Sequence, residues 1–271
     1  MLDKPPTGVE LVRSRLKPSL LAGAVALILV ALLVFTPGSI SEKYLLICSG
    51  SCAQRPAHTY YLGNQKLPVE ARMVGIFCGF LLTWIFLWFI GRTRAGKLSK
   101  RGINLLLALL VLAMLLDGLN ATFYDFGWFH PYQPQNWFRL LTGTLSGIGL
   151  AGLIYPLYNY AIWRFPWKIA PFQKWAELGV LLLVGATLMV LVMSGWDWLF
   201  LPLATLTVLG GLWMMCVFNL LIYVVLARRE NLYRDSWDLL PTLVAVFLFS
   251  LLEFTVTAAV RHLFLGAALY M

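Results

Sequence analysis

Seven long apolar stretches recur along the chain, and they constrain its fold more than any other feature of the sequence. An α-helix needs about 20 residues, at about 1.5 Å rise per residue, to cross a hydrocarbon layer roughly 30 Å thick. Because 60% of the residues are apolar and only 12% are charged, the composition is not that of a soluble domain. The sequence therefore predicts one all-α domain, 1–271, built as a polytopic transmembrane helix bundle. The predicted spans cover residues 20–36, 73–90, 103–119, 140–161, 175–194, 199–226 and 239–260.

The distribution of basic residues predicts how the bundle is oriented. Lys and Arg accumulate in short cytoplasmic segments because they resist translocation. With a cytoplasmic N-terminus, fifteen of the 21 Lys and Arg residues fall on the cytoplasmic side, while the C-terminus and the longest loop, 37–72, lie outside. The formal net charge of +9 is then a topology signal, which argues against nucleic-acid binding. We expect the first apolar stretch to be retained as a signal anchor, since no small-residue cleavage site follows Phe35.

Charged residues near the ends of the spans predict a polar pocket on the outer side. Asp117 lies at the outer end of the third span, and Arg72 and Arg139 lie at the outer starts of the second and fourth. Arg55 and His58 lie in the loop above them. Charge inside a membrane is costly, so such residues are functional candidates, and converging arginines bind anionic headgroups or substrates. The alternative is that these side chains reach the interface separately or only tie helix ends together.

Glu253 is a second candidate, because it lies inside the last predicted span. It is eight residues from Arg261, which corresponds to a depth of roughly 12 Å at about 1.5 Å per residue. A carboxyl group at this depth needs a partner or a proton. A structural hydrogen bond and a functional carboxylate both satisfy that requirement.

Two cysteines in the outer loop, Cys48 and Cys52, predict a disulfide, because an oxidising compartment permits one and a spacing of four suits a turning backbone. A redox-active pair and a two-thiolate metal site are the alternatives. No histidine lies in the middle of a span, which argues against an intramembrane bis-histidine haem, and we predict neither a metal nor a cofactor. The three histidines are His58, His130 and His262.

A family resemblance rests on motifs in the outer loop and the next three spans. They read Cys52-Ala53-Gln54-Arg55-Pro56, Glu70-Ala71-Arg72-Met73, Asp117-Gly118, and Asn136-Trp137-Phe138-Arg139 followed by Thr142-Gly143. In order and placement they resemble the prokaryotic membrane proteins of domain-of-unknown-function family 2085, over about residues 48–152. That family shows Cys-His-Gln with Pro and Arg after it, then Cys-Ala-Arg-Cys, Asp-Gly, and Asn-x-x-Arg with Thr-Gly.

The departures from this pattern matter for mechanism. Ala53 stands where the family has histidine, and Glu70 and Met73 stand where it has cysteines, so most of a soft-ligand set is missing. The resemblance implies a divergent member that keeps the polar part of the outer site. These retained residues are the predicted ligand-binding pocket: Gln54, Arg55, Arg72, Asp117, Asn136 and Arg139.

Together these features predict an integral protein of the prokaryotic plasma membrane that serves as an accessory or lipid-binding component of a larger assembly. Its expected partners are membrane lipids and other membrane subunits. One rival is an enzyme acting on a lipid or isoprenoid, with Asp117 or Glu253 as acid or base. Another is a proton-coupled transporter that uses Glu253. The sequence contains no nucleotide loop, zinc motif or nucleophile elbow, so we favour a non-enzymatic role.

Overall fold

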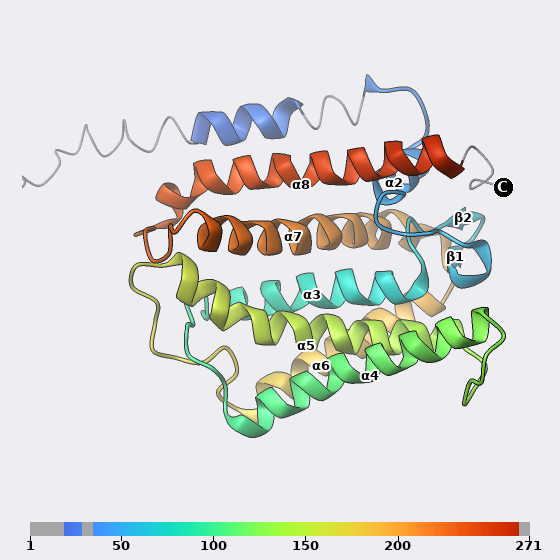
Figure 1. Ribbon diagram of the computed structural model, residues 1–271, viewed down its shortest axis with the longest axis horizontal. Helices are drawn as coiled ribbons and strands as arrows, with labels where there is room; N and C mark the ends of the chain where they lie inside the picture. Colours follow the sequence, from blue (N-terminus) through green and yellow to red (C-terminus); the bar gives the residue numbers. More distant parts are fainter. Residues whose placement is uncertain (1–18, 29–34, 266–271) are drawn as a thin grey trace, which may run out of the picture.

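The computed structural model describes residues 19–28 and 35–265, and these form long helices lying side by side (Figure 1). Six helical segments in the described ranges are long and apolar enough to cross a membrane, which confirms the predicted all-α membrane class. The long helices are α3 (Ala71–Phe89), α4 (Arg101–Asp125), α5 (Asn136–Ile162), α6 (Trp175–Met193), α7 (Phe200–Leu226) and α8 (Ser236–Leu265). The shorter elements are α2 (Ile40–Cys48), the 3-10 helices η1 (Pro56–His58) and η2 (Asp197–Leu199), and strands β1 (Tyr61–Leu62) and β2 (Gln65–Lys66).

The first predicted span, 20–36, is described only in part. Ser19–Ile28 forms a short apolar helix, whereas residues 29–34 lie outside the described residues. A seventh span and the orientation of the bundle therefore stay predictions. The predicted boundaries differ most at α4, which continues to Asp125 rather than ending at residue 119. Asp117 consequently lies about two turns before the end of that helix.

Helix α3 lies between α5 and α7 and contacts both at close range (Figure 1). A Cβ atom on Gly143 or Gly147 of α5 would overlap the backbone of α3, and one on Gly79 of α3 would lie 2.6 Å from Thr144 O. In the sequence, Gly143 and Gly147 have the small-xxx-small spacing that permits close helix approach, and the structure shows that approach. Gly210 of α7 meets the backbone of α3 from the opposite side. This packing places the first turn of α3, which carries Arg72, beside the first turns of α5.

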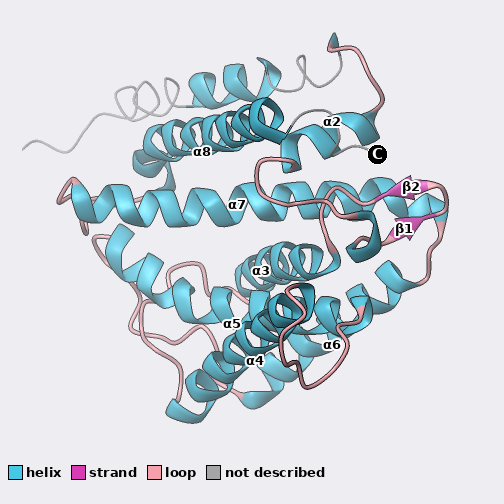
Figure 2. Ribbon diagram, turned by 45° about the vertical axis from the view of Figure 1, so that its right-hand side comes forward, coloured by secondary structure: helices cyan, strands magenta, loops and turns pink. Residues whose placement is uncertain are grey.

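One end of the bundle is closed by the loop between α2 and α3, with its small antiparallel β1–β2 hairpin (Figure 2). The guanidinium of Arg261 in α8 donates to the carbonyl oxygens of Ser49, Cys52 and Ala53. The hairpin is joined to the turn between α6 and α7, because Gly63 N donates to Gly195 O at 2.8 Å. We call this end of the molecule the loop end.

The opposite end consists of the connections 91–100, 163–174 and 227–235. Their backbones pair through isolated parallel bridges between Ala95 and Trp167 and between Trp163 and Tyr233. The Lys and Arg residues of 92–101, 164–174 and 228–234, which were counted as cytoplasmic in predicting the orientation, lie at this end. We therefore call it the basic end.

Candidate functional site

Asp117 lies at the centre of a buried polar cluster at the loop end. Only 2% of its surface is exposed. Arg72 of α3 donates to its Oδ2 at 2.5 Å, the hydroxyl of Thr142 in α5 donates to the same oxygen at 3.1 Å, and Tyr132 donates to Oδ1 at 2.7 Å. The carboxylate therefore links α3, α4, α5 and the loop before α5. Since both of its oxygens already accept hydrogen bonds, it is poorly placed to act as an acid or base.

A second cluster surrounds Glu70, which immediately precedes α3. Its Oε1 accepts hydrogen bonds from the backbone and the guanidinium of Arg55, both at 3.1 Å. Arg55 also donates to Asp125 Oδ2 at 2.8 Å, and His58 Nδ1 lies 3.7 Å from Glu70 Oε2. Burial would raise the pKa of Glu70, but the hydrogen bonds from Arg55 outweigh it and the pKa is lowered. Burial and the charges of Arg139 and Arg55 lower the pKa of His58, which keeps the imidazole neutral at pH 7.

Arg139 of α5 differs from Arg55 and Arg72, the two arginines of these clusters. Only 6% of its surface is exposed, yet it forms no ion pair within the described residues. Its side chain makes one hydrogen bond there, from Nη1 to Asn136 Oδ1 at 3.3 Å, and Asn136 in turn donates to Ala57 O at 2.9 Å. In addition, Arg72 Nε and His58 Nδ1 are buried and have no hydrogen-bond partner among the described residues.

Five of the six residues of the predicted pocket therefore lie in or between these two clusters, and Gln54 does not. Its amide donates to Leu45 O and Pro68 O, both at 2.7 Å, and its backbone has a φ of 55°. Gln54 thus holds the loop against α2 and the segment before α3 instead of facing an anion.

The predicted disulfide is not formed in this structure, in which Cys48 and Cys52 are free thiols. Cys48 ends α2 and packs into the core, while Cys52 Sγ accepts a hydrogen bond from Glu70 N at 3.2 Å. Burial, with a smaller contribution from Cys52, raises the pKa of Cys48 to about 12, and burial also raises the pKa of Cys52. Both groups are therefore thiols at neutral pH. Among the described residues, no three Cys, His, Asp or Glu side chains come together as metal ligands.

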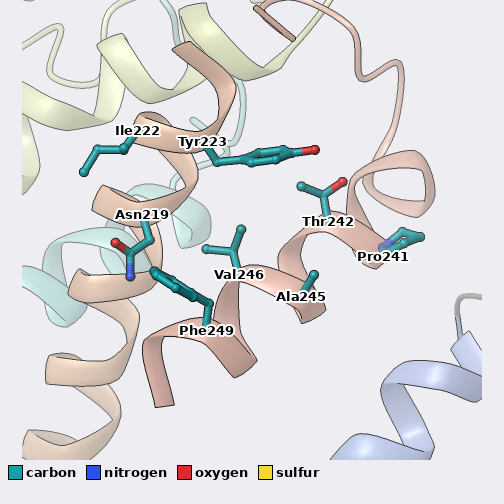
Figure 3. Close-up of a pocket in the computed structure, with 8 residues that line it drawn as sticks. All are labelled: Asn219, Ile222, Tyr223, Pro241, Thr242, Ala245, Val246 and Phe249. Atoms are coloured by element: carbon teal, nitrogen blue, oxygen red, sulfur yellow. The ribbon is translucent and has the colours of Figure 1, made fainter. Parts of the chain in front are cut away.

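Glu253 lies away from these clusters, on α8. Its Oε2 accepts a hydrogen bond from the amide of Asn219 in α7, which also donates to Ser250 Oγ at 2.9 Å. Asn219 lines a cavity of about 490 Å³ between the two helices, to which Thr242 and Phe249 of α8 also contribute (Figure 3). Glu253 itself lines a neighbouring cavity of about 400 Å³. The structural hydrogen bond considered for Glu253 is therefore present, and it engages Oε2 of the carboxyl group.

Several members of the two clusters were missed from the sequence. Asp125 lies beyond the predicted end of its span, and Tyr132 lies in a loop without periodicity. Glu70 was noted only as a replacement for a family cysteine. Thr142 offered one usable signal, because it follows Arg139 at a spacing of three and so shares a helix face with it.

No curated protein and no solved structure matches the chain significantly. The two clusters lie within the segment that carries the family motifs, whereas Glu253 lies outside it. Residues 52–153 match the family model DUF2085, described as "Predicted membrane protein", which confirms the resemblance predicted from those motifs.

Proposed function

We propose that this protein is a lipid-binding component of a membrane assembly, and that Arg139 receives the anionic group of a membrane lipid at the loop end. The observation that carries the proposal is the contrast between Arg139 and its neighbours. Arg72 is paired with Asp117, and Arg55 is paired with both Glu70 and Asp125. Arg139 is more buried than either of them but has only the Asn136 side chain as a partner.

Removing a guanidinium from water without an anion is costly, because its lost hydration is not replaced by an ion pair. The nitrogens of Arg139 that lack a partner are not among the fully buried polar atoms, so an anion can reach them. A phosphate or carboxylate would supply that pair, and Arg is suited to it because its planar fork donates two parallel hydrogen bonds. The nearby carboxylates are already engaged by other side chains. An external anion is therefore the partner that fits Arg139 best.

A cavity at the start of α5 is the proposed route for such a headgroup, although Arg139 itself does not line it. This cavity of about 280 Å³ is lined by Tyr132 and by Trp137 and Phe138, which directly precede Arg139 in α5. Trp137 is exposed, as is common for indoles at the membrane–water interface. Tyr132 lines this cavity and also donates to Asp117, so it connects the surface to the buried cluster.

The test is lipid retention by the purified protein. We expect Arg139→Gln to lose a co-purifying anionic lipid that native mass spectrometry detects on the wild type, and Arg139→Lys to retain part of it. Arg55→Gln is the matched control, because it removes a neighbouring arginine that already has carboxylate partners. Equal lipid occupancy in the wild type and Arg139→Gln would contradict the proposal, provided both have the same melting temperature.

The accessory role is tested in the same preparation. Gentle extraction from the native membrane should yield other membrane subunits at a fixed ratio to this chain. If the chain elutes alone but carries lipid, the result would support the lipid-binding role and contradict the accessory role.

A proton-coupled carrier is the second candidate, and the Glu253–Asn219 pair between α7 and α8 favours it. The carrier predicts pH-dependent flux in liposomes that Asp117→Asn leaves intact and Glu253→Gln abolishes. Absence of flux in the wild type, or flux unaffected by Glu253→Gln, would exclude it.

A further inference from the structure

A separate cavity of about 470 Å³ lies at the basic end, where the connection before α4 meets the connection before α6. Four cationic residues line it, and no acidic residue does: Lys97, Lys100, Arg101 and Lys168. None of these four forms an ion pair within the described part of the chain, where the salt bridge nearest in sequence joins Arg92 to Glu177. We call this cavity the basic cradle.

Hydrogen bonds join the two connections that form the cradle. Gly96 N donates to Trp167 O at 3.0 Å and Lys97 N donates to Ile169 O at 3.1 Å, so the two connections pair along their backbones. The buried hydroxyl of Ser99 accepts a hydrogen bond from Phe172 N at 3.2 Å. These bonds fix the backbone from which the four cations project.

The cradle lies at the ends of two helices that are long and apolar enough to cross a membrane. Arg101 begins α4 and the opposite wall ends just before α6, so the cavity lies where two membrane-spanning helices start. Leu98 and Ile169 add apolar surface to the lining, and Leu98 is exposed. A ligand that matches both the charges and the apolar surface is an anion attached to a hydrocarbon chain.

From this arrangement we infer that the basic cradle binds the phosphate group of an anionic membrane phospholipid. The volume lies within the roughly 300–1,000 Å³ of small-molecule sites, and basic pockets between membrane helices are suited to phospholipid headgroups. The topology signal explains why basic residues gather at this end. It does not explain why four of them line one cavity between two connections that are joined by hydrogen bonds. This site is independent of Arg139, which lies at the other end of α5.

The experiment compares two triple variants that remove equal charge from the basic end. Lys97→Gln, Lys100→Gln and Lys168→Gln together empty the cradle of three cations. Arg228→Gln, Arg229→Gln and Arg234→Gln together remove three cations from the α7–α8 connection. Delipidated proteins are titrated with phosphatidylglycerol, with phosphatidylcholine of the same chains, and with glycerol phosphate, and bound ligand is counted by native mass spectrometry.

We expect the wild type to prefer phosphatidylglycerol over phosphatidylcholine, and the cradle variant to lose on the order of tenfold or more in affinity. The control variant should stay within about threefold of the wild type, since its charges lie outside the cavity. Introduced into an Arg139→Gln background, the three cradle substitutions should cause the same loss of affinity as in the wild type, which separates the cradle from the site proposed at the loop end.

Three results would overturn the inference. Equal losses in the two triple variants would mean that general charge attracts the lipid. Binding of glycerol phosphate as tight as that of phosphatidylglycerol would make the ligand a soluble phosphate. Loss of all binding in Arg139→Gln, with an unchanged melting temperature, would remove the cradle as an independent site.

Discussion

At the scale of single residues, the loop end shows how the same side chain has different roles according to its partners. Arg72 and Arg139 both lie near the first turn of a membrane helix, but only Arg72 has a carboxylate within ion-pair distance. Asp117 accepts hydrogen bonds from three donors through both of its oxygens, which gives it the geometry of a structural anchor. Arg139 retains unused donors, which gives it the geometry of a ligand group.

We predict that Asp117→Ala lowers the free energy of unfolding by about 3 kcal/mol, because breaking a buried pair leaves an uncompensated charge on Arg72. Thr142→Val removes one weaker hydrogen bond to the same carboxylate and should cost only about 1 kcal/mol. Melting of the detergent-solubilised variants measures both. An Asp117→Ala protein as stable as the wild type would contradict the anchor role.

The titration of His58 predicts a loss of stability on mild acidification. Its pKa is lowered in the folded protein, so the unfolded chain takes up a proton at a pH where the folded protein does not. Stability should therefore fall as the pH drops below the ordinary histidine value of about 6.5. The lowered pKa of Glu70 adds a further loss below the ordinary range of a glutamate.

The measurement is the melting temperature between about pH 7.5 and pH 5.5. His58→Gln should flatten this dependence, whereas His130→Gln, which changes a partly exposed imidazole in the loop before α5, should leave it in place. A pH dependence that persists in His58→Gln would assign it to other groups.

At the scale of elements, the glycine contact between α3 and α5 determines where the polar groups meet. Gly143 lies against the backbone of Arg72 and Gly147 against that of Ile76, so the two helices are in register at the loop end. Any side chain at these positions would push α3 away from α5. The Arg72 guanidinium would then move relative to Thr142, which shares its acceptor.

We predict opposite effects from two glycine substitutions in spanning helices. Gly147→Ala should destabilise the protein by about 1–3 kcal/mol, because the new methyl group meets the α3 backbone, which cannot move aside cheaply. Gly179→Ala should be neutral or stabilising by roughly 0.5–1 kcal/mol, because nothing lies near that position and alanine favours the helix. Equal melting temperatures for the two variants would argue against close packing of α3 on α5.

At the scale of the whole molecule, the two ends differ in chemistry. The loop end carries balanced charge in paired clusters, while the basic end carries cations with few carboxylates. This asymmetry is the reason why the basic end is expected to be cytoplasmic. The two proposed lipid sites would then lie on opposite leaflets.

We predict that a membrane-impermeant maleimide labels Gln133→Cys in intact cells and labels Thr93→Cys only after the membrane is opened. Both positions are exposed and lie at opposite ends of the bundle. The native cysteines give little background because all four are buried. The reverse pattern of labelling would show that the orientation is opposite to the predicted one.

The sequence by itself determined the membrane class, the approximate spans and the asymmetry of charge, because each depends on local composition over about 20 residues. It also predicted that Gly143 and Gly147 permit close packing, and it identified most of the charged residues at the loop end. Only the tertiary structure decided which of those charges pair. Ion pairs such as Arg72 with Asp117 join residues far apart in the chain, and their geometry depends on how α3, α4 and α5 pack. For the same reason the isolation of Arg139 and the gathering of four cations around one cavity are not visible in the sequence.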